Sequence, residues 1–182
     1  MTQNSGLQDD LNYVANVVRG ESIERGVPAI YYLWALLIGI GFSLPDFAPQ
    51  HAGLFWAITG PGGGLLSWYL GARAARRSGV DDRSQAARYG YHWLICGAGF
   101  VLAGIPGAGG MTGAEFGQGM LLVATLAYGL AALHLDRGLA LPAVLLGVGY
   151  LVIKLALLPY AWTVTAVLIA ISLVISGRRA AA

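Results

Sequence analysis

The sequence has very little charge for its length. Of its 182 residues, 11% are Asp, Glu, Lys or Arg, whereas soluble globular domains have about 25%. Apolar residues make up 57%, and the mean hydropathy is +0.64. Because so few charges cannot cover a water-facing exterior, we expect an exterior that faces lipid.

Cysteine and lysine are each present once, as Cys96 and Lys154. A single thiol excludes an intrachain disulfide and an intrachain cysteine metal cluster. Its position in an apolar run is typical of a small buried side chain. A net charge of +2 with no basic and aromatic run gives no indication of nucleic acid binding.

Catalytic and metal-binding motifs are also missing. The chain has no Gly-x-Ser-x-Gly, no Walker lysine and no His-Glu-x-x-His. His51 and Asp46 stand close in the sequence, but they offer too few ligands for zinc. We therefore expect a protein that is not an enzyme, and we predict no metal site and no resident cofactor.

Apolar runs near the length of a membrane span are abundant. About 20 apolar residues cross the hydrocarbon layer as a helix. Six segments approach this length, namely residues 29–44, 53–72, 91–105, 116–135, 139–158 and 160–176. The last two form one stretch too long for a single crossing at about 1.5 Å per residue, and Pro159 favours a turn between them. We predict an all-α integral membrane protein with six transmembrane helices within residues 28–177.

The basic residues predict the direction in which the chain crosses the membrane. Arg and Lys concentrate in short cytoplasmic loops, and a cytoplasmic N-terminus places ten of the eleven there. The ten are Arg19, Arg25, Arg73, Arg76, Arg77, Arg83, Arg88, Arg137, Arg178 and Arg179. The preference for Arg over Lys, with abundant Ala, Gly and Leu, fits a GC-rich bacterial genome. We expect a bacterial inner (cytoplasmic) membrane, with both termini, including the tail 178–182, in the cytoplasm.

Residues 1–27 precede the first span and are expected to form a cytoplasmic amphipathic helix. Leu7, Leu11, Val14 and Val18 recur at helical spacing and form one apolar stripe. Such a helix lies on the membrane surface or packs on its own protein or a sister subunit.

Three segments repeat the pattern Gly-x-Gly-aromatic. The copies are Gly39–Phe42, Gly97–Phe100 and Gly147–Tyr150, in the first, third and fifth spans. Spans two, four and six each end near Arg and Gly. This pattern suggests three helical hairpins of like orientation, although a glycine-rich membrane protein also produces such matches by chance.

The second span contains the run Gly60, Pro61, Gly62, Gly63 and Gly64. Pro and Gly weaken a helix, and irregular backbone at membrane depth survives only inside protein or against a water-filled cavity. The run predicts either a broken helix with a binding site or a kinked packing helix.

Lys154 lies within the fifth span near its outer end. Asp46 and Glu115 are the only acidic residues expected at that level. Ionisable groups inside a membrane are candidates for function. These three are expected to form a structural clamp or to line a path for an ion or solute.

His92 and His134 are expected at a similar depth on two neighbouring helices. Two such imidazoles are able to ligate a haem b iron, although His near a span end is ordinarily an interfacial polar group. The segment 73–90, with Arg73, Arg76, Arg77, Arg83 and Arg88, is expected to be a cytoplasmic loop that contains a short helix capped by Asp81 and Asp82. We expect this segment to contact lipid headgroups or a partner.

These features suggest three functions. The first is a transporter or channel subunit for an ion or small solute, as an oligomer. The second is a structural or regulatory accessory subunit of a larger membrane complex. The third is a haem b electron carrier through His92 and His134.

Overall fold

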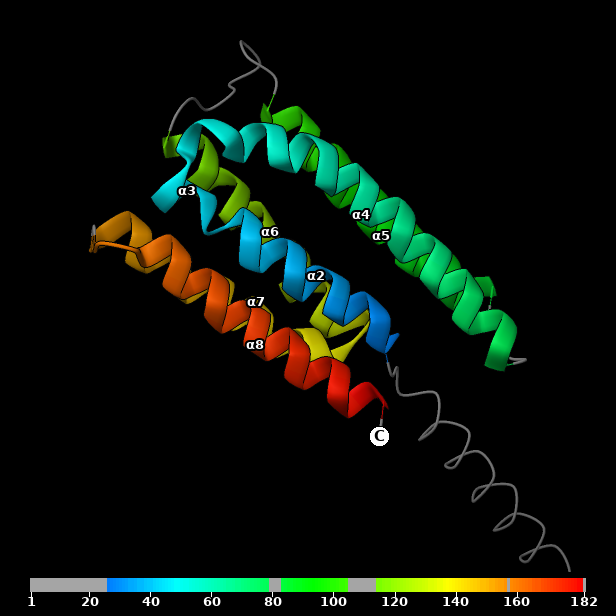
Figure 1. The fold of residues 1–182 in the computed structure, drawn as a ribbon. Coiled ribbons are helices and arrows are strands. Elements are labelled where there is room, and N and C mark those ends of the chain that lie inside the picture. The colour runs from blue at the N-terminus through cyan, green and yellow to red at the C-terminus, as the bar shows by residue number, and fades with distance from the viewer. Residues whose placement is uncertain (1–25, 79–82, 105–113, 157, 182) are drawn as a thin grey trace, which may run out of the picture.

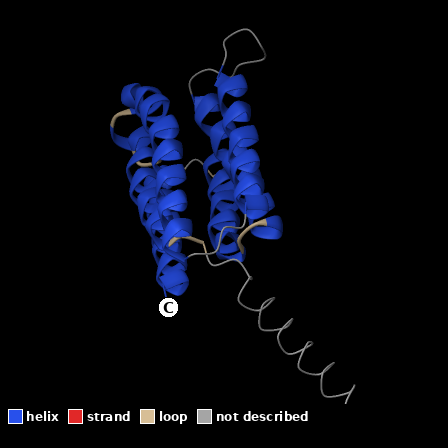
Figure 2. Cartoon of the chain, turned by 90° about the vertical axis from the view of Figure 1, so that its right-hand side faces the viewer, coloured by secondary structure: helices blue, strands red, loops and turns tan. Residues whose placement is uncertain are grey.

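The computed structural model describes residues 26–78, 83–104, 114–156 and 158–181. Within these ranges the chain is almost entirely helical and contains no strand, as Figure 2 shows. The expected amphipathic helix of residues 1–27 lies almost wholly outside the described residues. The all-α prediction is confirmed.

Six long helices and two short ones make up the described chain. They are α2 (Pro28–Gly41), α3 (Leu44–Phe47), α4 (Pro49–Ser78), α5 (Arg83–Gly104), α6 (Ala114–His134), the 3₁₀ turn η1 (Arg137–Leu139), α7 (Ala140–Leu155) and α8 (Ala161–Ala181). Three of them begin with proline in the first turn. Proline is suited to that position because its missing N–H has no helical acceptor there.

The long helices run back and forth along one direction (Figure 1). As a result, residue 26 and the C-terminus lie at the same end of the bundle. The pair α4 and α5 lies on one side and the pair α7 and α8 on the other, with α2 and α6 between them. Helix α4 packs on α2 and α5 packs on α6, whereas α4 and α5 barely touch each other.

The core lies between α2, α6, α7 and α8. Its fully buried side chains include Leu121 and Leu146, with Ile169 and Leu173 from α8. In contrast, α4 and α5 contribute no buried hydrophobic side chain, although they are 30 and 22 residues long. The described chain is therefore a four-helix core with two peripheral helices.

Four segments are long and apolar enough to cross a membrane. They are Pro28–Phe47, Glu115–His134, Arg137–Leu155 and Ala161–Ala181. These helices indicate an integral membrane protein. Helices α4 and α5 are long enough, but their Gly, Ser, Trp and Arg content keeps them below the hydropathy of the other four.

The segment expected as an arginine-rich loop is mostly helix. Helix α4 continues to Ser78 and α5 begins at Arg83, so only residues 79–82, which lie outside the described part, separate them. Alanine and arginine are strong helix formers, which explains why both helices extend beyond their apolar stretches. At about 1.5 Å per residue, the arginine-bearing end of α4 extends past a hydrocarbon layer about 30 Å thick.

The expected interruption of the second span is absent. Helix α4 runs from Pro49 to Ser78 without a break, and Pro61 lies inside it. The prediction of a turn near Pro159 is confirmed, because α7 ends at Leu155 and α8 begins at Ala161. Tyr160 has a φ of 56° there, a left-handed conformation that is typical of tight turns.

Candidate functional site

The outer surface of α4 and α5 is unusual in its glycines. Seven glycines of these two helices have open space where a Cβ atom would stand, namely Gly53, Gly60, Gly62, Gly64, Gly90, Gly97 and Gly99. Glycine costs a helix about 1 kcal/mol relative to alanine, and in membranes it is found where another backbone approaches closely. No described part of this chain approaches these seven closely.

Three of these glycines share one side of α4. Gly53, Gly60 and Gly64, together with Ala57, follow the spacing i, i+4, i+7 and i+11, which places them in one helical stripe. Gly60 and Gly64 form the small-xxx-small pattern that packs membrane helices closely. We call Gly53, Ala57, Gly60 and Gly64 the α4 small-residue stripe.

The side of α4 that faces α2 is packed by large side chains instead. The Trp34 indole donates a hydrogen bond of 2.9 Å to the Ser67 hydroxyl. The rings of Phe42 and Trp56 lie 5.2 Å apart, and Gly63 receives the side chain of Leu37. Helix α4 is therefore anchored along one face, and the stripe lies outside that anchored face.

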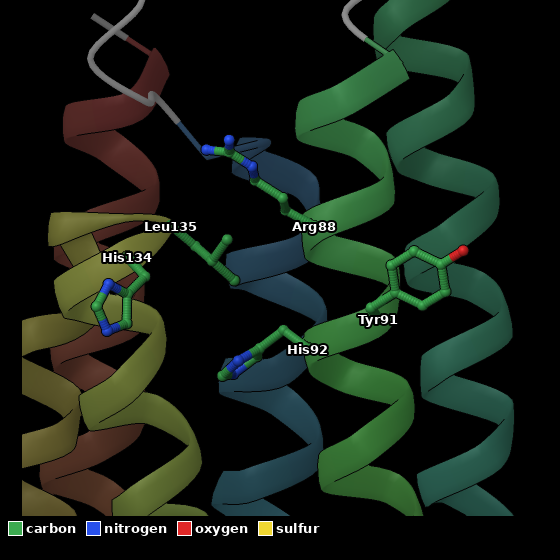
Figure 3. A pocket seen from close by; sticks show the side chains of 5 residues that line it. All are labelled: Arg88, Tyr91, His92, His134 and Leu135. Atoms are coloured by element: carbon green, nitrogen blue, oxygen red, sulfur yellow. The ribbon is translucent and has the colours of Figure 1, made fainter.

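His92 and His134 line one cleft between α5 and α6 (Figure 3). Arg88, Tyr91 and Leu135 complete its lining, and its volume is about 460 Å³. We call it the α5–α6 cleft. It lies at the end of the bundle where the arginines gather, because α5 begins and α6 ends there.

The His92 ring is fixed by contacts with α6 and with neighbouring side chains of its own helix, α5. Its Nε2 lies 3.1 Å from the carbonyl oxygen of Ala127, and a carbonyl only accepts, so Nε2 donates. The same nitrogen lies 3.7 Å from Cys96 Sγ, and the Trp93 ring packs edge-on at 5.0 Å. Because Nε2 donates to this carbonyl, Nδ1 is the His92 nitrogen that remains for iron, and the haem hypothesis is otherwise supported only by the shared cleft. A Soret band in the purified protein is the measurement that would establish it.

Metal-ligand clusters do not occur among the described residues. No group of three His, Cys, Asp or Glu side chains converges there.

The structure does not bring Lys154, Asp46 and Glu115 together. Lys154 is exposed, and it forms no ion pair with any described residue. Glu115 is exposed in the first turn of α6. Asp46 instead accepts hydrogen bonds from the Thr163 backbone N–H at 2.7 Å and from the Thr163 hydroxyl at 2.6 Å. The clamp expected from these three residues is not formed among the described residues, and the path for an ion or solute stays a prediction.

Asp46 caps the N-terminus of α8, although it lies far from that helix in the sequence. Thr163 lies in the first turn of α8, where backbone N–H groups have no acceptor within the helix and where negative charge is favourable. Asp46→Ala is expected to lower the free energy of unfolding by about 1–2 kcal/mol. Unfolding by SDS in mixed micelles checks this value, with Glu115→Ala as a charge-matched control that should cost less, about 0.3–1 kcal/mol, because Glu115 is exposed in the first turn of α6. Equal effects of the two variants would contradict the capping role.

The arginines that were predicted to contact lipid headgroups or a partner lie at one end of the bundle, as far as the structure describes them. Arg73, Arg76 and Arg77 are exposed on the last turns of α4, and Arg88 lines the α5–α6 cleft. Arg178 and Arg179 end α8 at the same level. Lys154 is at the opposite end, near the end of α7.

The glycines of the expected repeat have partly equivalent surroundings. A Cβ at Gly41 would meet the ring of Trp56 in the next long helix, and a Cβ at Gly149 would meet Thr165 in the next long helix. The middle copy differs, since Gly99 has open space. Two copies thus place their second glycine against the following helix.

Asp136 is the residue that the sequence reasoning did not single out. It is 4% exposed, and its carboxylate accepts hydrogen bonds from the Tyr31 hydroxyl and, at 2.8 Å, from the Gly138 N–H. The Ser176 hydroxyl of α8 donates to the Gly138 carbonyl at 2.7 Å. The only sequence signal was its place between Leu135 and Arg137, where a carboxylate beside an arginine resembles an ordinary surface turn.

Comparisons with known proteins complete the description of these sites. The chain matches no protein-family model, no curated protein and no solved structure. Its function is therefore argued from the geometry given above.

Proposed function

We propose that this protein is a non-catalytic integral membrane subunit that assembles with other membrane helices through α4 and α5. The observation that carries the proposal is the contrast between the two parts of the bundle. The core between α2, α6, α7 and α8 buries its hydrophobic side chains, whereas α4 and α5 bury none. Seven of their glycines face open space.

Lipid is a poor neighbour for such a surface. Acyl chains gain nothing from close backbone approach, whereas a second helix gains dispersion contacts along a stripe of small residues. Helices α4 and α5 are also less apolar than the four candidate spans. A protein neighbour supports both helices at membrane depth better than lipid does.

We also propose a topology for the subunit. All six long helices cross the membrane as three like-oriented hairpins, with both termini in the cytoplasm of a bacterial cell and the membrane being the inner one. The alternating directions of the helices support six crossings (Figure 1). The arginines at one end of the bundle support the orientation.

A transport role for this subunit has weaker support. Lys154, Asp46 and Glu115 do not converge among the described residues, and α4 is continuous through Gly60–Gly64. An accessory role in an assembly needs none of these groups, so we propose that role in preference.

Purification from native membranes in mild detergent tests the proposal. We expect the chain to elute with further chains, either other proteins or copies of itself, and mass spectrometry of the complex tells which. Gly64→Leu in the α4 small-residue stripe is expected to weaken this association by about tenfold or more, because a leucine side chain separates the helices. The fold itself should persist, since nothing lies within 4 Å of the Gly64 Cβ position.

The matched control is Gly129→Leu. Gly129 lies in α6 and also has open space beyond its Cβ position, but it is outside α4 and α5. We expect this variant to assemble like the original protein. A chain that elutes alone at its monomer mass, or equal losses for the two variants, would contradict the proposed function.

A further inference from the structure

The α5–α6 cleft and the exposed side of α5 beside it are separate from the α4 small-residue stripe, and the lining of the cleft includes basic side chains from both helices. Arg88 and His134 supply nitrogen donors, whereas the Tyr91 side chain points away from the two imidazoles (Figure 3). None of the five lining residues is acidic. A cleft of about 460 Å³ with this lining is suited to an anion.

Among the residues that the structure describes, no carboxylate pairs with the basic side chains of the cleft. Arg88 is exposed, and it forms no ion pair with any residue that the structure describes. The nearest acidic residue in the sequence to His134 is Asp136, which is buried with its carboxylate bonded to Tyr31 and Gly138. Asp136 therefore stabilises the fold and leaves the Arg88 guanidinium available to a ligand.

The bonding of His92 indicates which groups would contact the ligand. Its Nε2 already donates to Ala127, so His92 forms a fixed wall of the cleft. His134 is exposed at the end of α6, and it forms no hydrogen bond with a described residue. In Figure 3, Arg88 extends from α5 above the two imidazoles. The free donors are thus Arg88 and His134, one from each helix.

An apolar surface runs along α5 beside the cleft. Tyr91, Ile95, Ala98 and Leu102 recur at i, i+4, i+7 and i+11 and are all exposed. They form a stripe that begins one turn after Arg88 and leads toward the other end of the helix. An acyl chain fits this stripe, whereas a soluble anion would gain nothing from it.

We propose that the α5–α6 cleft binds the phosphate of an anionic phospholipid, with Arg88 and His134 as donors and the exposed α5 stripe against an acyl chain. Guanidinium groups pair with phosphate through two parallel hydrogen bonds. The arginine-rich end of the bundle is also the end expected at the anionic cytoplasmic surface.

Native mass spectrometry of the full chain in a neutral detergent tests the proposal, with phosphatidylglycerol as the probe. We expect saturable binding of phosphatidylglycerol and much weaker binding of zwitterionic phosphatidylcholine. Arg88→Gln is expected to weaken phosphatidylglycerol binding by about tenfold or more, since it removes a charged donor. His134→Gln should weaken it by a smaller factor.

Arg178→Gln is the matched control, because it removes the same charge from the exposed end of α8. We expect it to change binding by less than about twofold. Equal losses for Arg88→Gln and Arg178→Gln would overturn the proposal, since binding would then follow net charge alone. If inorganic phosphate bound as tightly as phosphatidylglycerol, the proposal that the ligand is a lipid would be overturned. A Soret band would assign the cleft to haem.

Discussion

Asp136→Ala is expected to destabilise the protein by about 2–4 kcal/mol, more than any other removal of a single polar side chain. The carboxylate is 4% exposed and accepts hydrogen bonds from Tyr31 and Gly138. Alanine leaves the buried Tyr31 hydroxyl without its acceptor. Leaving a buried group unsatisfied costs more than the bond itself was worth.

The position of Asp136 explains why the effect should be large. The turn that follows α6 collects bonds from three other helices. Tyr31 reaches it from α2, Ser176 reaches the Gly138 carbonyl from α8, and the Tyr89 hydroxyl of α5 donates to the Leu135 carbonyl at 3.0 Å. Removing the carboxylate loosens the point at which these helices meet.

Glycines at positions 26 and 138 leave the space in which Asp136 and Tyr31 contact each other. A Cβ at Gly138 would stand 3.0 Å from Asp136 Oδ1 and would also meet the Tyr31 hydroxyl. A Cβ at Gly26 would meet Asp136 Oδ2 and the Tyr31 ring. The carboxylate therefore lies in a space that larger residues at 26 or 138 would fill.

A double-mutant cycle with Tyr31→Phe measures the interaction. Tyr31→Phe alone should cost about 1.5–3 kcal/mol, because the buried carboxylate loses one of its donors. The double variant should cost less than the sum of the two single variants, since neither partner is then left unsatisfied. Arg137→Ala, an exposed neighbour, should change stability by less than about 0.5 kcal/mol. Additive costs in the cycle, or an Asp136→Ala cost as small as that of Arg137→Ala, would refute this role.

The helices were predictable from the sequence because their signals are local. The apolar runs predicted six long helices, and Pro159 placed the turn between the last two, as found at Tyr160. The residues at which the helices begin and end were less predictable. Residues 73–90 were expected to be a loop with one short helix, but residues 73–78 and 83–90 instead extend the long helices α4 and α5. Hydropathy identifies the membrane-embedded part of a helix and not its end.

The partners of single side chains were not predictable from the sequence. Asp46 was paired with Lys154 on the basis of depth, yet it caps α8 through Thr163, 117 positions away. Depth in a membrane restricts a residue to a layer but does not give its direction around the helix axis. Opposite charge was the only criterion for choosing a partner of Asp46. In the structure its carboxylate binds the N-terminal end of α8, where N–H groups lack acceptors, and not Lys154.

The Gly60–Gly64 run was only partly predictable. Its composition allowed a broken helix or a kinked packing helix, and the broken helix is wrong, because each of these residues is helical in α4. Propensity is a weak prior that tertiary contacts override, and Trp34 and Trp56 secure α4 to α2 on either side of the run. The common level of His92 and His134 was predictable, because α5 and α6 are consecutive antiparallel helices, so that the start of α5 and the end of α6 lie at the same end of the bundle.

The contact between α7 and α8 should be the most sensitive to added volume. A Cβ at Gly149 would stand 2.8 Å from Thr165 Oγ1 and 3.1 Å from Thr165 Cβ. Thr165 is buried, and its hydroxyl is bonded to the Ala161 carbonyl at 2.7 Å. The Thr165 side chain therefore cannot rotate away without losing a buried hydrogen bond.

Gly149→Leu is expected to lower the free energy of unfolding by about 3 kcal/mol or more, because a leucine must push α7 and α8 apart. Gly149→Ala should cost about 1–2 kcal/mol, since the higher helix propensity of alanine offsets part of the clash. SDS titration in mixed micelles, followed by tryptophan fluorescence, measures both variants. In the same assay Gly129→Ala, whose Cβ position is open, should be neutral or stabilising by up to about 1 kcal/mol.

Thr165→Ala supplies the decisive comparison. It removes Cγ2 and Oγ1, the two atoms nearest to the new Cβ, but not the Thr165 Cβ itself. Gly149→Ala should therefore cost clearly less in the Thr165→Ala background than in the original protein, with a coupling of about 1 kcal/mol. If the cost of Gly149→Ala is the same in both backgrounds, Thr165 is not what excludes a side chain at position 149, and α7 and α8 cross elsewhere.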